Sequence, residues 1–217
     1  MLSRALLALL LAASAHAQLG SGGDVLTARD QHGNIAAVYN EFDGRFHSMQ
    51  IVRMTARGET VWNVTHSNSY YDKAYAAAMD SQADVLLAGE RRTDGRRSFL
   101  TLKYDHDGNF VWEAVSDRHD CAAMYLSLDR DDNAFVAGVC RRRDGFPVLL
   151  VKYSPDGREL WSRIYDGGGR NYLHGLLVDY TGNAMLSVET VFGNFHDGSY
   201  AMRTVVFAPD GRQADVR

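Results

Sequence analysis

Lys103-Tyr-Asp-His-Asp-Gly-Asn-Phe-Val-Trp112 is the stretch of sequence that decides the fold, because related phrases recur along the chain. Residues 152–161 repeat it closely, and residues 53–62 repeat it more loosely. A fourth copy at 206–215 ends in aspartate instead of tryptophan. The three tryptophans that close these phrases are the only ones in the chain, and they lie 50 and 49 residues apart. Self-similarity at such a period indicates a repeat architecture.

A second landmark is an acidic turn that begins with aspartate. It occurs at 30–34, 80–84, 129–133 and 179–183, at intervals of 50, 49 and 50 residues. Between the landmarks lie short apolar runs, such as 74–79 and 148–153, which are bounded by Gly, Asp and Asn. Runs of this length and setting are typical of β-strands. The connections within a repeat are short, so neighbouring strands are expected to pair antiparallel.

Each repeat is therefore predicted to be a four-stranded antiparallel meander. Val148-Leu-Leu-Val-Lys-Tyr153 is apolar at successive positions, so both faces of its sheet are expected to be covered. In an antiparallel sheet this indicates further sheets stacked on either side, as in a β-propeller. We predict an all-β fold, a β-propeller with repeats at about 22–66, 73–115, 122–165 and 172–217, each about 50 residues apart.

The second and third repeats resemble a known family. The segments SFLTLKYDHDGNFVWEAV (98–115) and AAMYLSLDRDDNAFVAGV (122–139) are similar to the bacterial β-propeller repeat often called the SBBP type. Its phrase runs K-Y-x-x-x-G-x-x-x-W and is followed by G-N-x-Y-V-x-G. The first repeat departs with Arg53-Met54, and the fourth with Val206-Phe207 and no tryptophan. The resemblance implies a propeller fold and no shared catalytic residues.

The sequence is compatible with three arrangements of the four repeats. A first strand is expected at 25–29 and a last one at 212–216, with no surplus strand to complete a blade from the other terminus. The alternatives are a closed four-bladed ring, an open arc, and two chains that form an eight-bladed ring. We expect the closed monomer. If each tryptophan packs its strand against the next repeat, Asp215 leaves the fourth repeat without such an anchor, and terminal repeats generally lack one neighbour.

Residues 1–17 have the pattern of a signal peptide. Arg4 supplies the positive charge, residues 5–13 are apolar, and Ala15-His-Ala17 matches a small-x-small cleavage site. The apolar run is too short to span a bilayer, so no membrane insertion is expected. The propeller domain at 18–217 is expected to be periplasmic or secreted, as a monomer or homodimer. The net charge of −4 gives no reason to expect nucleic acid as a partner.

The only two cysteines, Cys121 and Cys140, form a candidate disulfide, because an even count in an exported chain favours one. Both lie on one predicted hairpin that folds back at 129–133. A two-residue turn at Arg130 and Asp131 places them directly opposite each other. A three-residue turn places them diagonally on opposite faces of the strands. Two buried free thiols are the alternative.

The candidate ligand-binding residues gather at one end of the predicted meanders. Because the strands alternate in direction, the loops between second and third strands emerge with the linkers between repeats, and loops on a rigid scaffold often carry function. Arginine forks bind carboxylate or phosphate, and tyrosine offers a stacking surface. The alternative is solvated arginines paired with nearby carboxylates. The candidates are Arg91, Arg92, Arg97, Arg141, Arg142, Tyr71, His119 and Tyr172.

Signals for metal, cofactor or catalysis are weak. Asp129, Asp131 and Asp132 invite a calcium interpretation, but the turn lacks the spacing of an EF-hand, and capping of backbone donors is the simpler account. No HExxH, GxSxG, Walker loop or CxxC pair occurs, so we predict no catalytic residue, metal or cofactor. His174 lies inside a predicted strand, where we expect it to line the core or channel.

These observations favour an exported, non-catalytic module that binds a ligand or protein, with an anionic envelope or extracellular molecule as the suggested partner. Two alternatives stay open. One is a propeller-fold enzyme that acts on glycans, which only the fold suggests. The other is an outer-membrane β-barrel, since the expected number of strands is even.

Overall fold

The computed structural model describes residues 25–42, 47–67, 71–143, 145–193 and 198–216, and the predicted signal peptide lies outside this part. Strands alone make up the regular structure of the described residues, and none of these residues forms a helix long and apolar enough to cross a membrane. The strands are β1 (Val25–Arg29), β2 (Ile35–Phe42), β3 (His47–Met54), β4 (Thr60–His66), β5 (Tyr71–Met79), β6 (Val85–Thr93), β7 (Arg96–Tyr104), β8 (Phe110–His119), β9 (Cys121–Leu128), β10 (Ala134–Cys140), β11 (Val148–Tyr153), β12 (Glu159–Tyr165), β13 (Arg170–Val178), β14 (Ala184–Phe192), β15 (Ser199–Phe207) and β16 (Gln213–Val216).

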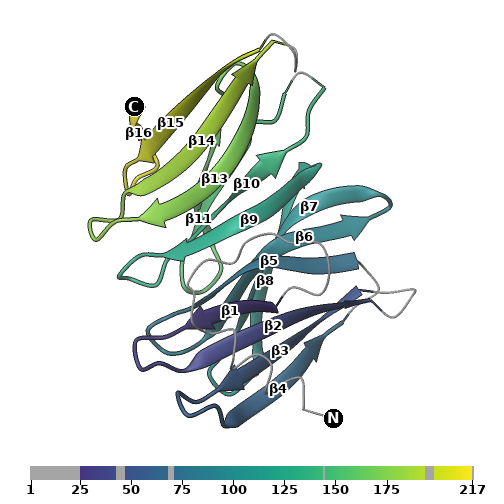
Figure 1. The fold of residues 1–217 in the computed structure, drawn as a ribbon. Coiled ribbons are helices and arrows are strands. Elements are labelled where there is room, and N and C mark those ends of the chain that lie inside the picture. The colour runs from purple at the N-terminus through teal and green to yellow at the C-terminus, as the bar shows by residue number, and fades with distance from the viewer. Residues whose placement is uncertain (1–24, 43–46, 68–70, 144, 194–197, 217) are drawn as a thin grey trace.

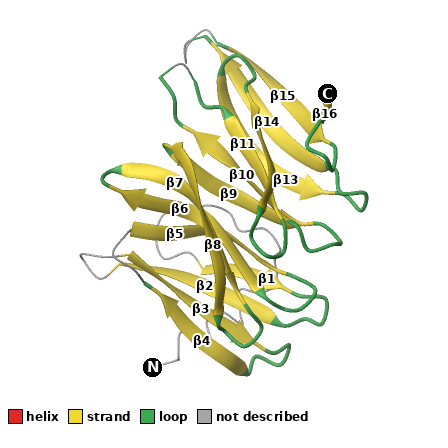
Figure 2. Ribbon diagram, turned by 180° about the vertical axis from the view of Figure 1, so that it is seen from behind, coloured by secondary structure: helices red, strands yellow, loops and turns green. Residues whose placement is uncertain are grey.

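These strands form four separate sheets, each of four consecutive antiparallel strands. The sheets span residues 25–66, 71–119, 121–165 and 170–216, close to the expected repeats. Figure 1 shows them stacked in chain order, from β1–β4 at one end to β13–β16 at the other, and Figure 2 shows the same order from behind. The predicted all-β fold of four antiparallel meanders, arranged as the blades of a propeller, is confirmed.

The acidic turns owe their shape to hydrogen bonds within each turn. The Asp30 carboxylate accepts from the backbone N–H of His32 and Asn34, at 2.9 Å each. Asp179 accepts in the same way from Thr181 and Asn183, again at 2.9 Å each. The fourth residue of each turn is left-handed, with φ of 82° at Gly33, 64° at Ala83, 59° at Asp132 and 82° at Gly182. Aspartate therefore caps backbone donors here, as the simpler account of these turns predicts.

A β-bulge interrupts the first strand of the second, third and fourth sheets. Tyr75, Met124 and His174 are the residues that have no partner on the neighbouring strand. In the third sheet Gly138 faces this bulge, and a Cβ built there would lie 1.9 Å from the Ala122 carbonyl oxygen. Gly89 has the same distance to Lys73 in the second sheet. At these two positions only glycine leaves room for the bulged backbone.

The bulge at Met124 also decides how the cysteines meet. Leu128 pairs with Ala134 next to the turn, a register that by itself would place the cysteines diagonally. The bulge shifts the register by one residue, so Cys121 pairs directly with Cys140. Their Cα atoms are 3.9 Å apart, and a disulfide joins them. The register at the turn is thus that of the three-residue alternative, and the bulge restores the direct pairing that the two-residue turn predicts.

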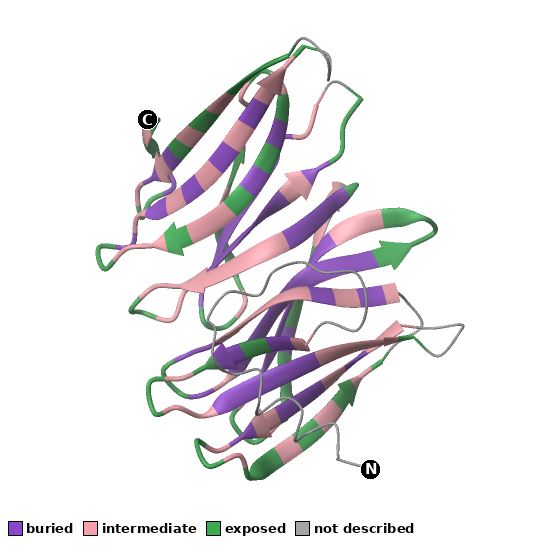
Figure 3. Ribbon diagram, in the orientation of Figure 1, coloured by how far each residue is buried: buried purple, intermediate pink, exposed green. Residues whose placement is uncertain are grey.

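The hydrophobic core is divided among the joints between consecutive sheets. One cluster of buried side chains fills the first joint, including Val38, Ile51 and Leu102. Separate clusters fill the second and third joints. In Figure 3 the buried strand positions lie mainly inside the stack, while β15 and β16 at its end are largely exposed. A fourth, smaller cluster lies on the first sheet alone, so most of the core depends on the stacking of neighbouring sheets.

The stack is an open arc instead of the closed ring expected from the sequence. Among the described residues, no buried cluster joins the fourth sheet to the first. The outward face of the fourth sheet leaves Leu177, Tyr200 and Met202 exposed, at 60%, 72% and 54%. In Figure 1 the first and fourth sheets lie at opposite ends of the stack. The physical reason lies in the tryptophans that link the sheets.

Each tryptophan reaches from the last strand of one sheet to the turn before the last strand of the next. The indole N–H groups of Trp62, Trp112 and Trp161 donate to the carbonyl oxygens of His106, Pro155 and Pro209, at 2.8, 3.0 and 2.9 Å. A Cβ built at Gly108, Gly157 or Gly211 would lie 3.0, 2.6 or 2.7 Å from the ring, so each ring rests on a turn glycine. We call this contact the tryptophan latch. The expected anchoring is confirmed, and Asp215 stands where a fourth latch would begin.

Candidate functional site

A cavity lies where the first strands of the second, third and fourth sheets approach one another. Its volume is about 430 Å³, within the range of small-molecule sites. We call it the inter-sheet pocket. Its lining consists of Tyr75, Arg97, Ala122, Met124, Val139, Arg141, Phe146, Asn171, Tyr172, Leu173 and His174.

The bulges bring three equivalent positions of the repeat into this pocket. Tyr75, Met124 and His174 are the bulge residues of the second, third and fourth sheets, and all three belong to the lining. An extra residue in a strand re-aims its side chain away from the regular alternation. One local feature, repeated in three units, therefore produces a site to which three sheets contribute.

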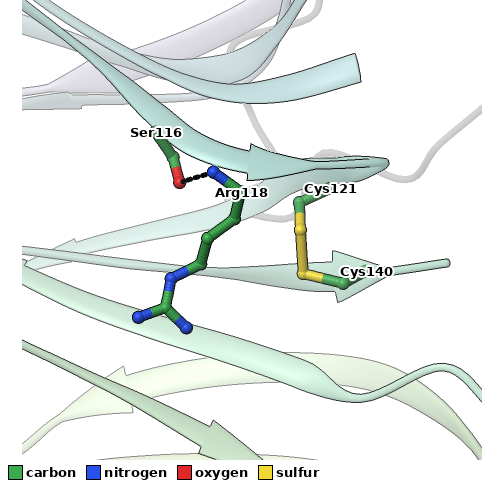
Figure 4. Close-up of a disulfide and its surroundings, with 4 residues drawn as sticks. All are labelled: Ser116, Arg118, Cys121 and Cys140. Atoms are coloured by element: carbon green, nitrogen blue, oxygen red, sulfur yellow. Dashed lines mark hydrogen bonds between the residues drawn. A yellow bond between two sulfur atoms is a disulfide. The ribbon is translucent and has the colours of Figure 1, made fainter. Parts of the chain in front are cut away.

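The disulfide holds one wall of the pocket together. Cys121 precedes the lining residue Ala122, and Cys140 lies between the lining residues Val139 and Arg141. Figure 4 shows the bond crossing between the ends of β9 and β10. Both cysteines are buried, with 1% and 4% of their surface exposed. The wall is thus fixed covalently where the hairpin ends.

Two arginines give the pocket its positive charge. Arg97 comes from β7, and one of its nitrogens lies 3.6 Å from the Glu90 carboxylate. Arg141 follows β10, and no described residue forms an ion pair or hydrogen bond with its guanidinium. Glu90 is fully buried, and its other oxygen accepts from Arg92 at 2.7 Å. Two guanidinium groups, those of Arg92 and Arg97, thus face one carboxylate, and Arg141 adds a further positive charge to the cavity.

The remaining polar groups of the lining are mostly engaged. Asn171 is 1% exposed, and its carboxamide oxygen accepts from Thr190 at 2.8 Å. His174 contacts the Glu189 carboxylate at 3.0 Å. Burial raises the pKa of Tyr75 to about 12, and the Glu90 charge adds to the shift. The Tyr75 phenol therefore stays protonated at neutral pH.

The structure brings some of the predicted binding residues together and separates others. Arg97, Arg141 and Tyr172 line the pocket. Arg92 and Tyr71 lie outside the lining and contact each other, with the Arg92 guanidinium 4.5 Å from the Tyr71 ring centre. Arg142 is exposed and lies outside the lining. The side chain of His119 lies outside the described part of the structure. Sequence reasoning did not identify Tyr75, Met124 and Phe146 as site residues.

Arg91 is placed in a different cluster, at the joint between the first and second sheets. It donates twice to Asp72, at 2.9 and 2.7 Å, and twice to Glu113, at 3.1 and 3.0 Å. The hydrogen bonds to Asp72 raise the pKa of Arg91 above its ordinary value. Arg91 thus pairs with nearby carboxylates, as in the alternative that the sequence left open, but it does so in a buried setting instead of a solvated one. Arg91 therefore serves the joint and does not reach the inter-sheet pocket.

His66 extends this cluster across the joint. One ring nitrogen lies 2.7 Å from the Tyr104 hydroxyl and the other 3.1 Å from Asp72. Burial, helped by the charges of Glu113 and Asp72, raises the pKa of Tyr104 to about 12. The Tyr104 hydroxyl and the Asp72 carboxylate thus each hold one ring nitrogen of His66. These groups satisfy one another, so the cluster links the first sheet to the second.

The pocket offers binding groups more clearly than catalytic ones. Its described lining includes no aspartate or glutamate, whereas most glycosidases flank the scissile bond with two carboxyl groups. Across the described residues, no group of three or more His, Cys, Asp or Glu side chains is arranged to hold a metal ion. What converges on the cavity is arginine, aromatic rings and aliphatic surface.

No family model matches the chain, so its likeness to the SBBP-type repeat remains a prediction. No curated protein is significantly similar in sequence. Among solved structures, a mutant Bombyx mori GH32 β-fructofuranosidase in complex with sucrose matches 88% of this chain and 48% of its own, at 12% identity and a TM-score of 0.48. A mannose phosphorylase from Leishmania mexicana in complex with phosphate ion matches 92% and 73%, at 13% identity and a TM-score of 0.42. The chain spans about half the length of the first of these proteins. Neither likeness identifies a ligand.

Proposed function

We propose that this chain is an exported, non-catalytic β-propeller module that binds an anionic molecule in the inter-sheet pocket. The observation that carries the proposal is the convergence of Arg97 and Arg141, from two different sheets, on a cavity with aromatic and aliphatic walls. The planar guanidinium fork matches the oxygens of a carboxylate or phosphate, so two such groups at one cavity suit an anionic ligand.

The scaffold around the pocket supports a binding role. A ligand that meets a preformed site loses less free energy to ordering the protein. Here the bulges are held by glycine at positions 89 and 138, and the disulfide fixes the wall that carries Arg141. The Tyr75 phenol, protonated at neutral pH, adds a hydrogen-bonding group to the lining.

Paired arginine substitutions test the proposal. The mature chain at 18–217 is compared with Arg97→Ser/Arg141→Ser and with a control pair, Arg142→Ser/Arg143→Ser, which removes the same charge outside the lining. Binding to acidic glycans, aromatic anions and anionic phospholipid vesicles is measured by calorimetry. A hydrogen bond to a charged group contributes about 1.5–3 kcal/mol, so each lost arginine should weaken binding about tenfold or more.

Two results would refute the proposal. In the first, the pocket pair binds every probe as well as the unsubstituted chain does. In the second, the control pair loses as much affinity as the pocket pair, which would mean that only the overall charge matters. Circular dichroism and thermal melting of all variants establish that each is folded.

A further inference from the structure

We infer that the ligand of the inter-sheet pocket is a small molecule with one apolar, preferably aromatic, ring and one carboxylate or phosphate group. This inference rests on the proposed function and narrows its ligand class. It follows from which polar groups of the lining are free to meet a ligand and which already have partners.

The walls of the pocket suit a flat apolar body. Met124, Val139 and Leu173 supply aliphatic surface. Phe146 and Tyr172 supply aromatic surface, with ring centres 6.5 Å apart and planes inclined by 56°. Tyr75 contributes a third ring from the second sheet. Aromatic rings favour offset or tilted contact with another ring, so a ligand ring can pack against these aromatic walls.

The polar groups argue against a ligand rich in hydroxyl groups. Asn171, the lone carboxamide in the described lining, is committed to Thr190 and to the backbone of Gly169. His174 is committed to Glu189. A buried hydroxyl without a partner costs about 1–3 kcal/mol, and a sugar ring carries several. The lining therefore leaves too few partners for a sugar, although it leaves enough for a single anionic group.

The charge balance fits one anionic group. Arg141 has no ion-pair partner among the described residues, and Arg97 shares Glu90 with Arg92. The contact between Arg97 and Glu90 is an ion pair of 3.6 Å without a hydrogen bond. Arg97 and Arg141 therefore both have guanidinium N–H groups available for the oxygens of one carboxylate or phosphate. Carboxylate and phosphate both match the arginine fork.

Matched probes test the ligand class on the mature chain. 3-Phenylpropionate and phenyl phosphate carry the ring and the charge, 3-phenylpropanamide lacks the charge, and glucuronate and inorganic phosphate lack the apolar ring. Dissociation constants are measured by calorimetry or ligand-observed NMR. We expect at least one aromatic anion to bind tenfold or more tightly than the other three compounds, and the ratio between the two aromatic anions distinguishes carboxylate from phosphate.

Two variants connect the binding to the pocket. Tyr172→Ala should weaken binding of the aromatic anion by fivefold or more and leave that of inorganic phosphate unchanged, whereas Arg141→Ser should weaken both. If glucuronate or an acidic glycan binds as tightly as the aromatic anions and depends on Arg97 and Arg141, the inference is wrong and the proposed function stands. If no probe depends on these arginines, both are wrong.

Discussion

A double-mutant cycle between Trp112 and Gly157 measures how strongly one tryptophan latch holds two sheets together. Gly157 has a φ of 86°, and a Cβ built there would lie 2.6 Å from the Trp112 ring. Gly95 also has a positive φ, 75°, but a Cβ there meets nothing within 4 Å. Gly95→Ala is therefore the matched control, because it reports the backbone cost alone.

The expected magnitudes follow from this difference. A left-handed residue other than glycine costs about 1–2 kcal/mol, which is the whole expected effect of Gly95→Ala. Overpacking against the indole adds about 1–3 kcal/mol, so Gly157→Ala should lower the free energy of unfolding by about 2–5 kcal/mol. Trp112 is 9% exposed and donates to Pro155 at 3.0 Å. Trp112→Ala should therefore cost about 3–5 kcal/mol.

The coupling is the decisive quantity. With alanine at position 112 there is no indole to clash with, so Gly157→Ala should cost only about 1–2 kcal/mol in that background. The double mutant should then be more stable than the sum of the single effects implies, by about 1–3 kcal/mol. Urea unfolding followed by far-ultraviolet circular dichroism gives all four values. Additivity within about 0.5 kcal/mol, together with equal costs at Gly95 and Gly157, would show that the Trp112 indole and Gly157 do not interact energetically and would refute the account of the latch.

Four further changes probe other parts of the molecule. Asp72→Ala removes one carboxylate partner of the buried Arg91 guanidinium and should lower the free energy of unfolding, measured in urea, by about 3–5 kcal/mol. Asp131→Ala, which removes an exposed ion pair with Arg130, should change it by no more than about 0.5 kcal/mol. Gly138→Ala places a Cβ 1.9 Å from the Ala122 carbonyl oxygen, so it should abolish the bulge and release thiols that react with Ellman's reagent; a fully oxidised, equally stable variant would contradict this account. Cys121→Ala/Cys140→Ala removes the disulfide, which closes a loop with a sequence separation of 19, and should lower the free energy of unfolding by about 3 kcal/mol. Adding reductant should not destabilise this variant further. Hydrogen bonds from Asn183 and Thr181 lower the pKa of Asp179 from 3.8 to about 2, so the stability that this carboxylate contributes is complete above pH 4 and disappears as the pH falls to 2. Thermal melts of Asp179→Asn should therefore show a shallower decline over that range, and an unchanged slope would contradict the role of this turn.

The repeat was predictable because its signals are local. Tryptophan spacing, acidic turns and short apolar runs each depend on a few neighbouring residues, and the sheets follow them closely. The lysine of the repeated phrase has an equally local reason. Lys103 contacts Asp80 at 2.8 Å, and Lys152 contacts Asp129 at 3.1 Å, so each ties a third strand to the acidic turn of its own sheet.

The inter-sheet pocket was less predictable because it depends on strand register. Arg91 and Arg92 are adjacent and look alike in the sequence, yet alternation along β6 sends Arg91 into the first joint and Arg92 toward Glu90. The bulges at Tyr75, Met124 and His174 reverse that alternation locally, and no residue type marks them reliably. Gly89 and Gly138 are a partial signal, but the fourth sheet has Val188 at the matching position.

The direction of the tryptophan latches has a consequence for folding. Each indole docks on a turn that is about 45 residues further along the chain, so a sheet gains its latch only after its successor has been made. Three of the buried clusters each join two neighbouring sheets, and a fourth lies on the first sheet alone, so among the described residues the stability of each sheet depends mainly on its neighbours, as in a one-dimensional array. The two outer sheets each rest on one neighbour, and the two inner sheets rest on two. Amide hydrogen exchange should therefore be slowest in β5–β12 and faster toward both ends, with the inter-sheet pocket on the boundary between protected and exchanging parts.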